Sequence, residues 1–185
     1  GTHVQVAPEG RYPHCDRMGL SVWQDMPGGN FGKGEAAKQQ YRVEHRRLVE
    51  FLHNYPCIVM WVPFNEGWGQ YESGKIVDLV RETDPTRLVN HASGWHERGV
   101  GDVVDRHHYP DPQPPAPERS RAAVQGEYGG LGFNIPGHMW QEEGWGYALF
   151  PDEASLTRRF EDFLITIRDA AESAGLSAAV YTQTT

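Results

Sequence analysis

The sequence predicts an α/β fold built as an incomplete (β/α)8 barrel, and three observations support this prediction. Short apolar runs alternate with longer helical patterns along the 185 residues, and such alternation is typical of parallel sheets. Polar or aromatic side chains follow several of these runs, as in barrels whose active sites lie at the carboxyl ends of the strands. No glycine-rich phosphate-binding motif opens a helix, so the competing fold, an open nucleotide-binding sheet, has no support.

Six apolar runs are predicted to be buried strands. Each is short, rich in β-branched, small or aromatic residues, and bounded by Gly, Pro or Asp. A complete barrel has eight strands and usually about 250 residues. We therefore expect the beginning of the barrel and its last helix to lie outside this chain. The runs lie at residues 19–23, 57–62, 87–92, 102–108, 122–127 and 176–183.

Three helices are predicted between these strands. Apolar residues recur at helical spacing over residues 36–54 and 71–83, and a proline follows each segment closely. A third apolar stripe runs over residues 156–171. Asp152 or Ser155 can cap the amino end of that helix, and Gly175 is suited to terminate it.

The composition excludes some classes of function. The formal net charge is −8 and the isoelectric point is near 5.5, which disfavours general binding to nucleic acids or anionic membranes. No apolar run approaches the roughly 20 residues that span a bilayer. The sequence does not open with a basic region and an apolar stretch, so no signal peptide is visible and the compartment stays open.

Two glutamates follow predicted strands and lie among glycines and aromatic residues. Glu66 is part of "FNEGWG" and Glu127 is part of "QGEYGG". Because the strands of a barrel end on one face, two carboxyl groups there can divide the acid and nucleophile roles of glycoside hydrolysis. A retaining enzyme needs them about 5–5.5 Å apart. The competing interpretation is that each glutamate is a solvated loop residue.

These motifs resemble glycoside hydrolase family 2, the group of β-galactosidases, β-glucuronidases and β-mannosidases. The segments that carry the resemblance are "DRMGLSVWQDMP", "HNYPCIVMWVPFNEGWGQ", "DPTRLVN" and "QGEYGGLG", and it extends from about Val4 to Thr185. It implies that the chain holds approximately strands 3 to 8, as one partial catalytic barrel domain over residues 1–185. The family's N-terminal β-sandwich domains and the first barrel strands would be absent, and we expect the isolated chain to be inactive.

The resemblance also implies roles for individual residues. Glu66 matches the general acid/base, and Glu127 matches the nucleophile. Asn65 matches the residue that hydrogen-bonds the sugar 2-hydroxyl. Tyr109 resembles the tyrosine that hydrogen-bonds the nucleophile, although its "RHHYP" context differs from better-known members. Further candidates for contact with the sugar are Trp23, Asp25, Trp68, Trp95 and His108; for the tryptophans, simple packing is the alternative.

The expected function is that of a β-galactosidase-like retaining β-glycosidase, with a carbohydrate substrate and neither cofactor nor metal. One alternative is an inactive or sugar-binding relative. Another is a metal-dependent barrel hydrolase that uses the histidines, but no tight metal-ligand spacing occurs among them. Sensitivity to a chelator would distinguish that alternative. His107 and His108 point to opposite faces if the strand is extended, so at most one faces the barrel mouth.

Overall fold

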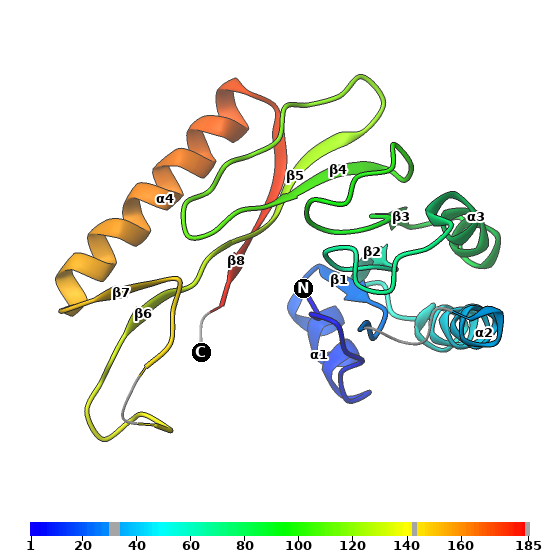
Figure 1. Cartoon of the computed structure of the whole chain (residues 1–185), viewed down its shortest axis with the longest axis horizontal. Helices are drawn as coiled ribbons and strands as arrows, with labels where there is room; N and C mark the ends of the chain where they lie inside the picture. The colour runs from blue at the N-terminus through cyan, green and yellow to red at the C-terminus, as the bar shows by residue number, and fades with distance from the viewer. Residues whose placement is uncertain (30–33, 142–143, 184–185) are drawn as a thin grey trace. The chain divides into compact units, whose positions relative to one another are not determined.

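The computed structural model describes residues 1–29, 34–141 and 144–183, and the chain divides into two compact units, residues 1–104 and 105–185. Figure 1 shows the order of the elements along the chain. The elements are α1 (Arg11–Met18), β1 (Val22–Asp25), α2 (Glu35–Leu52), β2 (Ile58–Val62), α3 (Ser73–Thr83), β3 (Leu88–Val89), β4 (Val103–His107), β5 (Ala122–Gly129), β6 (Leu131–Phe133), β7 (Ala148–Phe150), α4 (Glu153–Ser173) and β8 (Leu176–Thr182).

The first unit contains a parallel sheet in the order β1-β2-β3. Trp23 pairs with Met60, and Trp61 pairs with Val89. Helices α2 and α3 pack against each other and lie to one side of the sheet (Figure 1). The connections between successive parallel strands run through these helices, as in βα units.

Two apolar clusters form the core of the first unit, and both join the strands to the helices. The burial of these side chains is the main force that stabilises the unit. The larger cluster contains Ala7, Tyr12, Cys15, Val22, Val49, Leu52, Cys57, Ile58, Trp61, Val77, Val80 and Val89. The smaller contains Met26, Tyr41, Phe64, Ile76 and Ala92.

Buried hydrogen bonds and an ion pair in the "DPTR" segment connect the end of α3 to the sheet. The fully buried Asp84 carboxylate accepts a hydrogen bond from Trp61 Nε1 at 2.9 Å and pairs with Arg87 at 2.6 Å. Burial alone would raise the pKa of Asp84, but hydrogen bonds from Thr86, Arg87 and Trp61 hold it well below its usual range. Arg87 also donates to the backbone oxygen of Ile58 at 2.6 Å. The "DPTR" residues, which are part of the resemblance to the family, therefore have a structural role.

The second unit is built on the long strand β5, which pairs in parallel with β8 in a sheet of order β4-β5-β8. Helix α4 packs on β8 through aromatic rings. Phe163 is buried and meets Tyr128 edge-on, while Phe160 meets Tyr181 edge-on. Strands β6 and β7 form a separate parallel pair (Figure 1).

The predicted strands and helices are confirmed, with some corrections. Of the two predicted candidates for the cap of α4, the structure selects Asp152, whose side chain accepts from the Ser155 N–H at 2.7 Å. Helix α1 was not predicted, because its sequence contains a proline; Pro13 lies in the first turn, where no intrahelical N–H bond is lost. Phe51 is part of the apolar pattern of α2 but is 60% exposed. Strands β6 and β7, only three residues each, were also missed.

Among the described residues, the strands form open parallel sheets and no closed eight-stranded one. This α/β arrangement agrees with the predicted incomplete barrel. None of the helices in the described part of the chain is both long and apolar enough to cross a membrane.

Candidate active site

The segment after β2 turns sharply at Glu66. The Glu66 N–H donates to the Ser93 carbonyl at 2.8 Å, and the Ser93 N–H donates to the Phe64 carbonyl at 2.9 Å, so the segment stays paired with residues beyond β3. Glu66 has a φ of +50°, a left-handed value that is unfavourable for a glutamate. Such local strain is often found at functional sites, where the surrounding structure maintains it.

Gly67 makes this turn possible. Its φ is +77°, and a Cβ atom at this position would lie 2.6 Å from Cγ of the His96 ring. Glycine has no steric penalty at such a φ and leaves room for the ring. The Gly67 in "NEGWG" thus allows the chain to reverse directly after Glu66.

Asn65 is buried and held through its side-chain oxygen. Its Oδ1 accepts a hydrogen bond from the Ser93 hydroxyl at 2.8 Å. Its Nδ2 is buried and has no hydrogen-bond partner among the described residues. A buried amide donor without a partner is costly, so a donor in this state is a candidate for binding a ligand oxygen.

Glu127 lies near the carboxyl end of β5, and its carboxylate is held by side chains of the same unit. The Tyr109 hydroxyl donates a hydrogen bond to Glu127 Oε2. The fully buried ring of His107 lies beside the same oxygen, with Nδ1 at 3.5 Å. Burial and then the hydrogen bond to Glu127 hold the pKa of Tyr109 well above its usual value, so the phenol stays a donor.

Neighbouring polar groups fix the backbone around Glu127. The buried Gln125 amide donates to the Glu127 carbonyl at 2.9 Å and to the Arg106 carbonyl at 3.0 Å. The Asp105 carboxylate accepts from the Gly126 N–H at 2.7 Å. A Cβ atom at Gly126 would collide with that carboxylate. The glycine before Glu127 therefore makes room for a polar anchor.

The two glycines after Glu127 bring aromatic rings close to the strand. Gly129 and Gly130 have φ values of +107° and +69°, and side chains there would collide with the rings of Tyr181 and Tyr147 respectively. Tyr147 in turn stacks on Tyr109, with ring centroids 4.0 Å apart. The glycines of "EYGG" thus leave room for two rings, and one of these, Tyr147, packs on the tyrosine that donates to Glu127.

The histidine beside Glu127 is His107, which sequence reasoning did not select. His108, the predicted contact, has its ring Nδ1 2.7 Å from the carbonyl oxygen of Asp111. Successive residues of an extended strand point in opposite directions, and the sequence could not tell which of the two faced the site. Contact of His108 with substrate stays a prediction.

The other predicted contacts lie on β1 or in the segments after β2 and β3 of the first unit. Trp23 and Asp25 belong to β1, and Asp25 Oδ2 accepts from the Val4 N–H at 2.9 Å. Trp68 and Trp95 are 44% and 56% exposed and lie in the segments after Glu66 and Ser93. Exposed indoles at such positions can stack on a sugar, so these roles stay predictions.

Comparison with known proteins identifies relatives of the chain. Residues 9–131 match the model of the glycosyl hydrolases family 2 TIM barrel domain. A β-mannosidase B of Thermothelomyces thermophilus is 39% identical over 64 residues, which cover 34% of this chain and 8% of that protein. A β-galactosidase of Klebsiella pneumoniae is 24% identical over 111 residues, covering 56% of this chain and 11% of that protein.

A solved structure agrees with the fold. The FMN-binding β-glucuronidase of Facaelibacterium prausnitzii L2-6 superposes with a TM-score of 0.69 at 17% identity, over 95% of this chain and 30% of that one. The chain thus spans less than a third of that neighbour and about a tenth of the two curated relatives. Since the family model covers well over half of the chain, the chain belongs to glycosyl hydrolase family 2 and represents part of its TIM barrel domain.

Proposed function

We propose that the protein hydrolyses β-glycosidic bonds with retention of configuration, with Glu127 as the nucleophile and Glu66 as the general acid/base. The observation that carries this proposal is the arrangement around Glu127. A phenol kept protonated donates to its carboxylate, and a buried imidazole lies beside the same oxygen. A hydrogen bond of this kind favours the ionised carboxylate that a nucleophile requires.

The reaction proceeds in two steps. In the first, a Glu127 oxygen bonds to the anomeric carbon while the glycosidic bond breaks, and the Glu66 carboxyl group gives its proton to the departing oxygen. In the second, water attacks the anomeric carbon of the glycosyl ester, Glu66 takes the proton from that water, and the Glu127 carboxylate leaves. Two inversions give a product of the original configuration.

Asn65 is assigned to the substrate 2-hydroxyl. Its amide nitrogen is buried and has no partner among the described residues, while its oxygen is held by Ser93. Hydrogen bonds to the 2-hydroxyl strengthen in the transition state and supply several kcal/mol in such enzymes. The partially satisfied amide of Asn65 supports this role.

The proposed glycone is galactose, by similarity to the β-galactosidase of Klebsiella pneumoniae. β-Mannose and β-glucuronic acid are the competing sugars, since relatives and neighbours carry those names. Hydrolysis rates for nitrophenyl β-galactoside, β-mannoside and β-glucuronide by the full-length protein would rank the three. No turnover of any of them would favour the alternative of an inactive or sugar-binding relative.

The decisive test of the mechanism is azide rescue of the Glu127→Ala variant in the full-length protein. This variant should lose hydrolysis, and azide should restore turnover and yield an α-glycosyl azide, because azide occupies the space of the missing carboxylate. The exposed Glu161→Ala variant on α4 is the control and should keep its activity. A β-configured azide would instead give Glu127 the acid/base role.

A further inference from the structure

A turn of the chain at residues 108–113, directly after β4, carries the tyrosine that contacts the proposed nucleophile. The Tyr109 hydroxyl donates to the Glu127 carboxylate. The Gly129 N–H of β5 donates to the Pro110 carbonyl at 2.9 Å, and this bond holds the first half of the turn beside the strand. The position of the turn therefore decides where the hydroxyl lies relative to the carboxylate.

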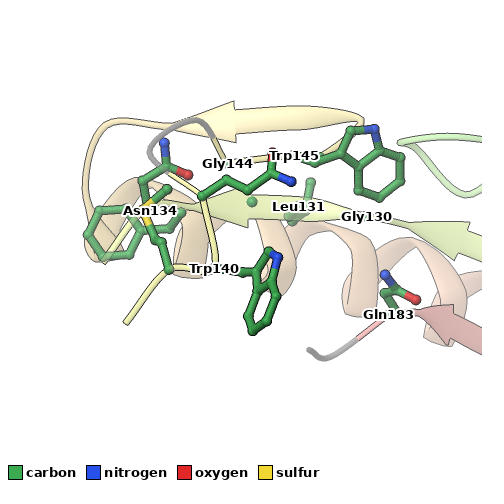
Figure 2. Close-up of a pocket in the computed structure, with 12 residues that line it drawn as sticks. Gly130, Leu131, Asn134, Trp140, Gly144, Trp145 and Gln183 are labelled. Carbon is green, nitrogen blue, oxygen red and sulfur yellow. The ribbon is translucent and has the colours of Figure 1, made fainter. Parts of the chain in front are cut away.

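The ring of Tyr109 is held by aromatic packing within the same unit. Tyr147 stacks on it with ring centroids 4.0 Å apart, and Trp145 meets Tyr147 edge-on at 5.1 Å. Trp145 lines a pocket of about 470 Å³ together with Gly130 and Leu131, and Figure 2 shows its indole beside these two residues. These contacts fix the plane of the phenol ring, and a separate set of polar contacts holds the turn that carries it.

The second half of the turn is anchored to α4 through Asp111. The Arg159 guanidinium pairs with the Asp111 carboxylate. The Asp111 carbonyl accepts a hydrogen bond from the His108 ring, whose Nδ1 lies 2.7 Å away. Prolines at positions 110 and 112 flank Asp111 and restrict the backbone on both sides of it. A shift of Asp111 is therefore passed along this stiff segment to the neighbouring Tyr109.

The Arg159 side chain is itself ordered by its neighbours on α4. Its guanidinium carbon lies 5.0 Å from the centroid of the Phe163 ring, and Phe163 is buried. Its Nη1 lies 3.8 Å from Asp162 Oδ2. Exposed ion pairs usually contribute little, because two flexible side chains must be ordered to form them. Here the aromatic ring already orders the planar guanidinium, so less is lost when Arg159 pairs with Asp111.

We propose that Arg159 is a positioning residue, which acts through Asp111 to hold the turn that presents the Tyr109 hydroxyl to Glu127. The inference rests on the proposed function and specifies how helix α4 contributes to it. Without the ion pair the turn can shift, and the hydroxyl then donates less well to the carboxylate that reacts. The expected loss is in kcat rather than KM, because a donor at a reacting charge acts mainly in the transition state.

The test compares two arginines of α4 in the full-length protein, on the nitrophenyl glycoside that it hydrolyses fastest. Arg159→Met keeps an apolar chain on Phe163 and removes the charge; it should lower kcat about fivefold and leave KM within twofold. Arg159→Lys keeps the charge and should recover most of the loss. Arg168→Met removes an arginine that pairs only 3.4 Å from the adjacent Asp169, and this matched control should keep the wild-type kcat.

A double-mutant cycle separates positioning from general damage to the fold. In a Tyr109→Phe background, Arg159→Met should cost less than twofold in kcat, because the hydroxyl that Arg159 positions is already absent. A full fivefold loss in that background would overturn the proposal. An unchanged kcat in Arg159→Met alone would overturn it as well.

The ¹⁹F resonance of 3-fluorotyrosine placed at position 109 of the full-length protein gives a readout that does not depend on turnover. It should move in Arg159→Met and in Asp111→Asn, and it should stay in place in Arg168→Met. An unmoved resonance in Arg159→Met would show that this arginine does not position Tyr109. If the resonance moves as expected but the wild-type protein hydrolyses none of the nitrophenyl glycosides, the positioning of Tyr109 is supported and the proposed function is contradicted.

Discussion

Glu66 follows strand β2 and Glu127 lies near the carboxyl end of strand β5, yet the structure holds them by different means. Glu66 is positioned through the backbone: a left-handed φ, an N–H bonded to Ser93, and a following glycine. Glu127 is positioned through its carboxylate, which meets the Tyr109 hydroxyl and lies beside His107. The difference fits two chemical roles, because a nucleophile needs a fixed ionised carboxylate while an acid/base group must gain and lose a proton.

The two units also differ in how they bury a histidine. In the first unit, His45 packs against the Tyr41 ring at a centroid distance of 5.8 Å, and its Nδ1 has no hydrogen-bond partner among the described residues. In the second, His107 lies beside the Glu127 carboxylate. One imidazole thus serves the core, and the other lies at the site. Both histidines are buried, so burial alone would not distinguish them; the neighbouring carboxylate of Glu127 does.

The largest expected effect comes from Glu66→Gln. Removal of a general acid costs about 10²–10⁴-fold in rate when the departing oxygen needs a proton. The loss should therefore be large for alkyl galactosides and much smaller for dinitrophenyl galactoside, whose oxygen leaves without protonation. Steady-state kcat/KM on both substrates measures this. Equal losses of kcat/KM on the two substrates would show that Glu66 is not the general acid. They would also contradict the proposed division of roles between Glu66 and Glu127.

Tyr109→Phe should lower kcat by about 10²-fold, the usual cost of one preorganised donor at a reacting charge. The ring of the phenylalanine keeps the stack on Tyr147, so the loss reports on the hydroxyl alone. Tyr128→Phe removes a hydroxyl from the residue that follows Glu127 on β5 and serves as the control. If Tyr128→Phe were the more damaging change, Tyr109 would not be the residue that holds the proposed nucleophile.

His45 should make the first unit sensitive to mild acid. Its burial lowers its pKa from 6.5 to about 4, so the unfolded chain binds a proton at a higher pH than the folded one. Stability is then full above pH 6.5 and falls as the pH drops toward 4, by about 2 kcal/mol at pH 5. The free energy of unfolding, measured in urea at pH 5 and at pH 7.5, should differ less between the two pH values in His45→Phe than in the wild-type protein. An unchanged difference would assign the acid sensitivity elsewhere.

The smallest expected effect is that of Ser93→Ala, which frees the amide oxygen of Asn65. The loss of one buried hydrogen bond costs about 1 kcal/mol, or roughly fivefold in kcat/KM. The effect should disappear with a 2-deoxygalactoside, which lacks the hydroxyl that Asn65 is proposed to bind. Asn65→Ala should follow the same pattern with a larger loss. A similar loss on both substrates would indicate a general disturbance of the segment around Glu66.

The sequence by itself determined the α/β class, the six main strands and the three longer helices. These features can be predicted because their signals are local. The spacing of apolar residues along a strand or helix, and the glycine or proline that ends it, act over a few residues. The pair of motifs around Glu66 and Glu127 was equally visible, since each combines a glutamate with glycines, which the turn after Glu66 and the close packing beside Glu127 require. Asp152 as the cap of α4 belongs to the same class of local signal.

Only the tertiary structure decided which side chains meet. Successive side chains along β4 point in opposite directions, and only the neighbouring strand β5 shows that His107, rather than His108, faces the Glu127 carboxylate. The stack of Tyr147 on Tyr109 and the pocket beyond it require β6 and β7, which are too short to leave a periodic signal. Phe51 fitted the apolar pattern of α2 but faces outward. Long-range packing selects among such locally equivalent choices, and no local pattern encodes it.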